Sequence, residues 1–170
     1  MTREQKIVSG GAAGGVLAML AGLWGLSMWM LGLPLNADGG ERVAYASGWI
    51  AVAAAPLFFS ITAVTASRFS GAAIDPTLGV ESRDMKIDGR VVDNTVQQYL
   101  LFIAASLGVA AGASGSEVRV VGAAALVFVT MRFAFWIGYR FNPLYRAFGM
   151  AGTSYLNVSL FCYAAWLAWW

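Results

Sequence analysis

Two groups of polar residues lie at the ends of apolar segments, where arginine and amide side chains are costly and need a specific role. Arg90, Asn94 and Gln97 recur at i, i+4 and i+7, and Arg132 lies seven residues before Tyr139. This spacing places each group on one face of a helix. Because arginine and amide groups donate hydrogen bonds to carboxylates, the sequence predicts a site for an anionic ligand.

The residue inventory limits the chemistry of such a site. The 170-residue chain has no histidine and a single cysteine, Cys162. The commonest general base is therefore missing, and we expect no disulfide and no zinc, haem or iron–sulfur site. The net charge of +2 includes no basic run, so nothing indicates nucleic-acid binding. Chemistry must come from Arg, Tyr, amide, Ser and carboxylate groups, or from a bound cofactor.

The composition predicts the elements that carry these residues. Hydrophobic residues make up 59% of the chain and charged residues 12%, whereas a soluble domain averages about 25% charged residues. Five apolar segments, at about 7–33, 46–66, 91–112, 118–139 and 143–170, are long enough to cross a membrane. We therefore expect an all-α, polytopic integral membrane bundle of five transmembrane helices.

Local signals refine two of these helices. Asn142 followed by Pro143 is a typical helix start, and it predicts the beginning of the fifth helix. Gly10-x3-Gly14 and Gly11-x3-Gly15 are small-residue pairs in the first segment, and they predict close packing of that helix on a neighbour.

Basic residues fall unevenly on the two sides of a five-span bundle. Of the 11 lysine and arginine residues, only Arg42 and Arg119 lie on the side opposite the N-terminus. Because cytoplasmic loops are enriched in Lys and Arg, this predicts a cytoplasmic N-terminus and an outer C-terminus, with Trp49, Trp166, Trp169 and Trp170 at the outer interface. The nine residues on the cytoplasmic side are Arg3, Lys6, Arg68, Arg83, Lys86, Arg90, Arg132, Arg140 and Arg146.

Each candidate residue also has a purely structural interpretation. Arg90 could extend to the lipid headgroups, and Asn94 could cap a helix or pair with a neighbouring one. Arg132 needs an internal partner or a ligand, and Asp88 or Asp93 could be that partner.

Three features of the cytoplasmic side have similar alternatives. Tyr139 could belong to an interfacial aromatic belt, and Arg146 could serve only as a positive-inside arginine. The long loop at 68–90 is either a solvated connection or a flap over a site.

The order and spacing of these residues resemble the MAPEG family, the membrane-associated proteins in eicosanoid and glutathione metabolism. The pattern is Arg-x3-Asn-x2-(acid or amide) opening one helix, Arg-x6-Tyr closing the next, and Arg seven residues later, within residues 48–170. The resemblance implies four-helix subunits that assemble as trimers and bind glutathione between subunits near the cytoplasmic face. Residues 1–45 would then form an additional N-terminal transmembrane helix and outer loop, and residues 46–170 the four-helix core of a bacterial inner-membrane protein.

The resemblance also implies roles for individual residues. Arg146 and Tyr139 would be catalytic, with Arg146 activating the thiol. The implied glutathione-binding residues are Arg68, Arg90, Asn94, Gln97 and Arg132. Two positions depart from the family pattern: Gln97 stands where glutamate is usual, and Phe135 stands where many active members have tyrosine.

Two functions follow from this resemblance. The first is a glutathione transferase or peroxidase that acts on a lipophilic electrophile arriving from the membrane lipids. The alternative is a non-catalytic homotrimeric subunit that binds other membrane proteins. A small transporter is disfavoured, because no span has a broken polar midsection.

Overall fold

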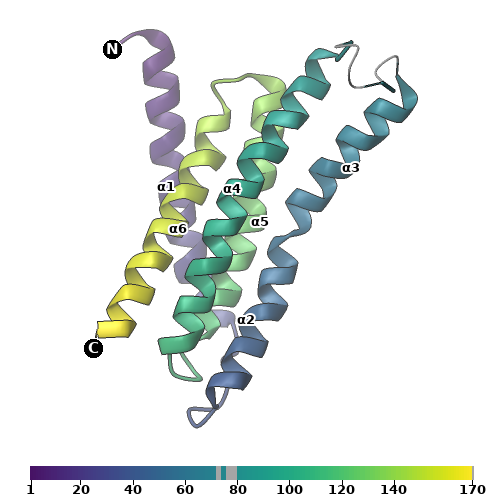
Figure 1. Cartoon of the computed structure of the whole chain (residues 1–170). Coiled ribbons are helices and arrows are strands. Elements are labelled where there is room, and N and C mark those ends of the chain that lie inside the picture. The colour runs from purple at the N-terminus through teal and green to yellow at the C-terminus, as the bar shows by residue number, and fades with distance from the viewer. Residues whose placement is uncertain (72–73, 76–79, 170) are drawn as a thin grey trace.

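The structure, a computed structural model, describes residues 1–71, 74–75 and 80–169. Within these ranges the regular secondary structure is entirely helical, and the helices are joined by turns and short loops. α2 and α3 are separated by one residue and form a single bent span, so the described chain makes five helical rods (Figure 1). The predicted all-α bundle of five helices is therefore confirmed. The helices are α1 (Arg3–Trp29), α2 (Gly39–Ala53), α3 (Ala55–Ser70), α4 (Arg83–Gly112), α5 (Arg119–Phe141) and α6 (Arg146–Trp169).

Four of the five rods have the length and composition of membrane-spanning segments. They are Arg3–Trp29, Gly39–Phe69, Arg83–Gly112 and Arg119–Phe141, and the fifth rod, α6, packs along α1, α4 and α5. These helices identify an integral membrane protein. The two ends of the chain lie at opposite ends of the bundle (Figure 1). Trp170, predicted at the outer interface, lies outside the described residues.

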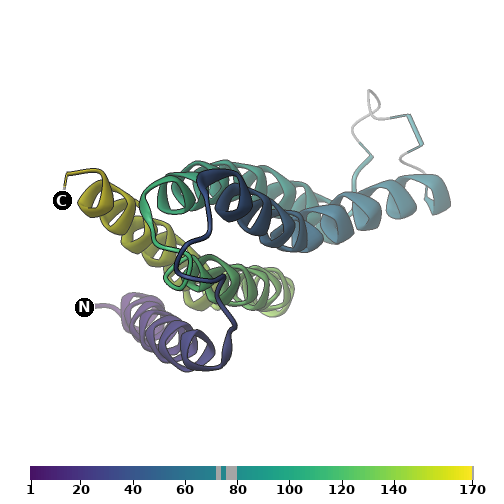
Figure 2. The same cartoon turned by 90° about the horizontal axis from the view of Figure 1, so that it is seen from below.

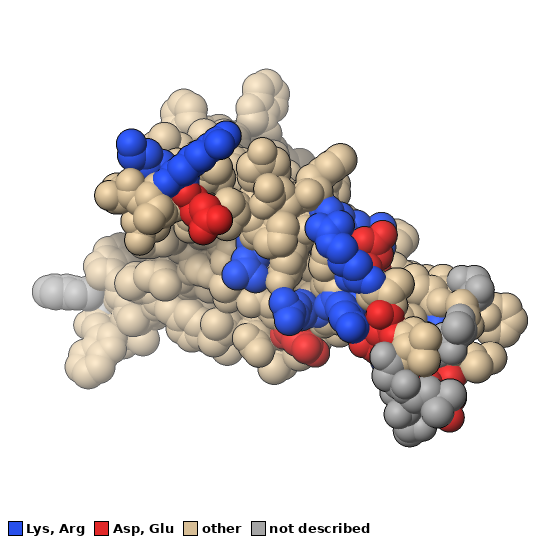
Figure 3. Space-filling model, turned by 90° about the horizontal axis from the view of Figure 1, so that it is seen from above, with Lys and Arg blue, Asp and Glu red and all other residues tan. Residues whose placement is uncertain are grey.

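α2 and α4 begin well before the apolar segments at about 46 and 91, because polar residues cap them. Asp38 accepts a hydrogen bond from the Glu41 N–H at 2.8 Å and forms a capping box that starts α2 at Gly39. Ser82 accepts from the Met85 N–H at 3.2 Å, so α4 starts at Arg83. Part of the predicted loop at 68–90 is therefore helix, and basic residues gather on that end of the bundle (Figure 3).

The predicted start of the fifth helix at Asn142 and Pro143 is wrong. Asn142 is the C-cap of α5, and its N–H donates to the Gly138 carbonyl at 2.9 Å. The Asn142 side-chain oxygen then accepts from the Leu144 N–H at 2.9 Å. Asparagine side chains stabilise turns as readily as helix starts. Here the turn reverses the chain, and α6 begins at Arg146, close to the end of α5.

A proline bends the second span. Pro56 lies at the first turn of α3, and its missing N–H and its ring are incompatible with an uninterrupted helix. Beyond Ala54, which ends α2, α3 leans away from the other helices (Figures 1 and 2). Arg68, in the last turn of α3, is thereby carried away from α5 and α6.

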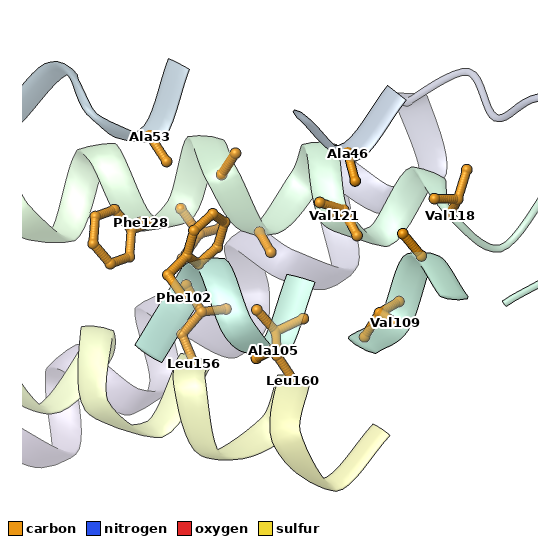
Figure 4. Packing of buried hydrophobic residues seen from close by; sticks show 14 of the residues in the cluster. Ala46, Ala53, Phe102, Ala105, Val109, Val118, Val121, Phe128, Leu156 and Leu160 are labelled. Atoms are coloured by element: carbon orange, nitrogen blue, oxygen red, sulfur yellow. The ribbon is translucent and has the colours of Figure 1, made fainter. Parts of the chain in front are cut away.

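The core forms where α4, α5 and α6 meet. The fully buried rings of Phe102 and Phe128 lie with centroids 4.8 Å apart, beside Leu156 (Figure 4). Gly149 allows α6 to approach α5 closely, since a Cβ there would lie 2.3 Å from the Met131 carbonyl oxygen. This backbone contact fixes the start of α6 against α5.

The first helix packs on α6 through glycines. A Cβ added at Gly15 would lie 2.0 Å from the Phe148 carbonyl oxygen, and one at Gly11 would lie 3.5 Å from Ala147 Cβ. No atom comes within 4 Å of a Cβ placed at Gly10. A Cβ at Gly14 would lie 3.6 Å from the Phe148 ring, so the predicted close packing is confirmed at Gly11, Gly14 and Gly15, and it is wrong for Gly10.

Candidate functional site

The hydroxyl of Tyr139 is the point where three helices converge. Arg90 Nη1 of α4 donates to it at 3.3 Å, and Arg146 Nη1 of α6 donates to it at 3.0 Å. The Arg146 guanidinium also lies 4.9 Å from the centroid of the Tyr139 ring. Within the described parts of the chain, neither arginine forms a salt bridge. Two positive charges therefore share one neutral acceptor.

These side chains open into two adjoining cavities at the charged end of the bundle. The first, called the polar cavity here, has a volume of about 340 Å³. The second, the basic vestibule, has a volume of about 390 Å³. The polar cavity is lined by Arg90, Asn94, Phe135, Tyr139, Arg146 and Met150, and the basic vestibule by Arg83, Lys86, Ile87, Arg90, Tyr139 and Pro143. Both linings contain basic residues and no acidic residue, so the site favours an anionic ligand.

Arg132 lies behind the polar cavity and is 1% exposed. Its Nη1 donates to Asn94 Oδ1 at 2.9 Å, its Nη2 donates to Thr95 Oγ1 at 2.7 Å, and its guanidinium lies 4.1 Å from the Phe135 ring centroid. The prediction that Asp88 or Asp93 is its partner is therefore wrong. Because Arg132 occupies the Asn94 carbonyl, it fixes the carboxamide so that the amide N–H groups remain available to the cavity.

Asp88 instead joins α4 to α5 as a buried structural carboxylate. It is fully buried, and it accepts hydrogen bonds from Trp136 Nε1 at 2.7 Å and from Arg140 Nε at 3.0 Å and Nη2 at 2.5 Å. Trp136 and Arg140 lie four residues apart on one face of α5. That spacing is the signal from which a shared acidic partner on α4 could have been predicted.

Two predicted ligand residues are not brought to the polar cavity within one subunit. Arg68 Nη2 lies 3.5 Å from Glu81 Oε1, in a separate cleft between α3 and α4 that Asp93 also lines. Gln97 is exposed and lines neither the polar cavity nor the basic vestibule. The structure thus brings together Arg90, Asn94, Tyr139 and Arg146, with Arg132 behind them. Sequence reasoning missed Arg83, Lys86, Ile87, Pro143 and Met150.

Between the α3 cleft and the polar cavity, α4 has an exposed seam. Exposed residues recur at alternating intervals of three and four, which is the heptad spacing of a helix that packs against other helices. They are Arg90, Asp93, Gln97, Leu100, Ala104, Leu107 and Ala111. Leu100 lies within this membrane-spanning helix, and its side chain is 61% exposed on the surface of the single subunit.

Comparison with protein-family models matches residues 16–166 to the MAPEG family. The match extends over all of the residues that line the polar cavity. No curated protein and no solved structure matches the chain.

Proposed function

Because this chain belongs to the MAPEG family, we propose that its polar cavity binds glutathione and that it is a glutathione-dependent membrane enzyme of the transferase or peroxidase type. The MAPEG family includes glutathione transferases and peroxidases, and it also includes non-catalytic members. The observation that carries the proposal is the convergence of Arg90 and Arg146 on Tyr139, without a salt bridge to either arginine among the described residues.

The cavities match the two carboxylates of glutathione, whereas its amine has no acidic partner in either lining. Arg83, Lys86 and Arg90 surround the basic vestibule and offer charged donors to a carboxylate. Asn94 adds amide donors in the adjoining polar cavity. In this arrangement the vestibule holds a carboxylate, and the polar cavity holds the thiol end of the tripeptide.

Arg146 and Tyr139 supply the chemistry at that end. A free thiol has a pKa near 8.5, so it is mostly protonated at neutral pH. A guanidinium beside the sulfur favours the thiolate, which is the nucleophile. The Tyr139 oxygen already accepts from two arginines, so its own hydrogen is free to donate to the sulfur. The thiolate then bonds to an electrophilic carbon, which gives up a π pair or a leaving group, or it bonds to the outer oxygen of a hydroperoxide, so that the O–O bond breaks, the alcohol leaves with a proton and glutathione becomes a sulfenic acid.

The oligomer that suits this site is a homotrimer. The exposed seam of α4 is spaced for packing against equivalent helices, and Leu100 and Leu107 would be buried there. In such an assembly, Arg68 of one subunit can approach the polar cavity of its neighbour, because Arg68 and the polar cavity lie on different sides of α4. Gln97, on the seam itself, would then also face a neighbouring subunit.

Two residues favour the alternative, a non-catalytic subunit that binds other membrane proteins. Phe135 lines the polar cavity beneath Arg132, and its side chain has no hydrogen-bond donor for a ligand. Gln97 lacks the carboxylate that would pair with the amine of glutathione. A subunit with these two residues can keep the fold while losing turnover.

A binding measurement on the purified protein in nanodiscs tests the proposal. Wild type should bind glutathione, and Arg90→Ala should weaken binding by about 1.5–3 kcal/mol, the usual contribution of a charge-assisted hydrogen bond. Arg119→Ala, which removes an arginine from the opposite end of the bundle, is the matched control and should bind as wild type does. No binding by wild type would refute the proposal, and binding without turnover of a model electrophile would favour the non-catalytic subunit.

A further inference from the structure

A further, apolar cavity lies where the first helix meets the last. This cavity, called the α1–α6 groove here, has a volume of about 380 Å³, which is within the range of about 300–1,000 Å³ typical of small-molecule sites. Val8 and Ala12 line it from α1, and Ala147 and Ala151 line it from α6. Leu144, in the turn before α6, contributes a further apolar side chain.

The α1–α6 groove adjoins the polar cavity. Arg146 and Met150, one turn apart on α6, line both. A molecule lying in the groove would therefore have one end beside the Arg146 guanidinium, which also contacts Tyr139. The adjacency puts an apolar binding surface and a thiol-activating cation next to each other.

The groove is bounded on one side and open on another. The close backbone contact between Gly15 and Phe148 holds α1 against α6 beside the groove. Val8 is 39% exposed and Tyr155 is 55% exposed, both on helices of the bundle exterior. An apolar molecule can therefore enter from the surrounding lipid.

We propose that the α1–α6 groove binds the alkyl chain of a long-chain α,β-unsaturated aldehyde, whose reactive end lies at Arg146, so that α1 determines the preferred chain length. This inference rests on the proposed glutathione-dependent function. The lining has no acidic residue and one basic residue, Arg146. That combination suits an apolar chain with a polar or electrophilic end, and the groove volume is too small for a polypeptide helix.

The reaction at that end is a conjugate addition. The glutathione sulfur bonds to the β-carbon of the aldehyde while the carbon–carbon π pair moves toward the carbonyl oxygen. The α-carbon then takes a proton, and the thiol has given up one, so the net change is addition of S–H across the double bond. No oxidant or reductant is required.

Two aldehydes of different length test the proposal, because they have the same reactive group. Wild type should show a higher kcat/KM for trans-2-dodecenal than for trans-2-hexenal. Ala12→Phe fills the groove and should lower kcat/KM for dodecenal about tenfold, as expected if about two methylene groups lose their contacts. The values for hexenal, and glutathione binding, should stay unchanged. Ala13→Phe is the matched control, since Ala13 is exposed on the same helix, and it should behave as wild type does.

Photolabelling separates failure of the groove from failure of the enzyme proposal. A twelve-carbon alkyl diazirine in nanodiscs should label α1 and α6 within the groove, and excess dodecenal and Ala12→Phe should each reduce that labelling. If wild type turns over neither aldehyde, the proposed function fails and labelling alone decides the groove. Labelling spread evenly over the lipid-facing helices, or equal loss of both aldehydes in Ala12→Phe, would overturn the groove assignment.

Discussion

Replacing Asn94 with aspartate should move stability and ligand binding in opposite directions. The two side chains have the same shape, so the new carboxylate can keep the 2.9 Å contact with Arg132 Nη1. Arg132 is 1% exposed and has only neutral partners, Asn94 and Thr95. The substitution gives this buried cation a counter-charge.

The magnitudes follow from that geometry. Two unit charges about 4 Å apart attract by about 4 kcal/mol at an effective dielectric constant of about 20. Desolvation of the half-buried carboxylate offsets most of this, so the free energy of unfolding should rise by about 1 kcal/mol. For glutathione, one amide donor is lost, which costs about 1.5–3 kcal/mol. The net charge beside the cavity also falls by one unit, so binding should weaken about 100-fold or more.

Unfolding in increasing SDS, followed by tryptophan fluorescence, measures the change in stability. Glutathione titration in nanodiscs measures the change in affinity. Asn94→Ala is the comparison, because it removes the acceptor without supplying a charge and should lower both stability and affinity. If Asn94→Asp binds glutathione as tightly as wild type, the amide does not face the ligand. If it unfolds more easily than wild type, Arg132 is not a cation in need of a counter-charge.

Four further predictions address the other parts of the molecule. Arg146→Ala should lower turnover strongly with little loss of glutathione affinity. The pH titration of the ultraviolet absorbance of the bound thiolate should differ from that of wild type, and identical titrations would reduce Arg146 to an interfacial arginine. Asp88→Asn should destabilise the fold by about 2 kcal/mol, less than a fully buried pair because Arg140 is 43% exposed, and an unchanged SDS midpoint would contradict this. Lysine at both Leu100 and Leu107 should yield monomers in native mass spectrometry, and intact trimers would exclude the α4 seam as the interface. Tags at the two ends of the chain should be accessible from opposite sides of the membrane, the N-terminal one from the cytoplasm, and labelling of both from one side would refute the orientation.

The sequence predicts the helical bundle well because long apolar segments are easy to recognise in it. Long apolar runs fix the number of rods, and few alternatives fit the spacing of basic residues. Helix ends are harder, since a capping residue acts through local geometry. Asn142 carries the same side chain whether it starts a helix or, as here, ends one and stabilises a turn. Asp38 and Ser82 extend helices into segments whose composition resembles loops.

The sequence likewise predicts some residues of the candidate site and misplaces others. Helical spacing correctly places Arg90 beside Asn94, and the i, i+7 spacing of Arg132 and Tyr139 places both toward α4. Spacing within a helix does not say which neighbour lies against each face. For this reason Gln97, on almost the same face as Arg90, lies on the exposed seam instead of in the cavity.

Partner choice for the buried arginine shows the same limit. Arg132 and Arg140 both lie on α5, and either could meet an acidic residue of α4. The relative height of the two helices decides that Asp88 pairs with Arg140 and that Arg132 meets amide and hydroxyl groups. That offset is set by tertiary packing, which no pattern within α4 or α5 reveals.

The contact between α1 and α6 has a consequence for biogenesis. Among the described helices, α1 contacts only α5 and α6, and these are the last two to be synthesised. The first helix therefore leaves the translocon without a partner and must wait in the lipid while two spans, α2–α3 and α4, are made before α5 follows. Its glycine surface, which accepts the Phe148 backbone at Gly15, is exposed during that interval. A ribosome stalled before α6 would release a chain with that surface uncovered, a feature by which membrane quality control could recognise an unfinished subunit.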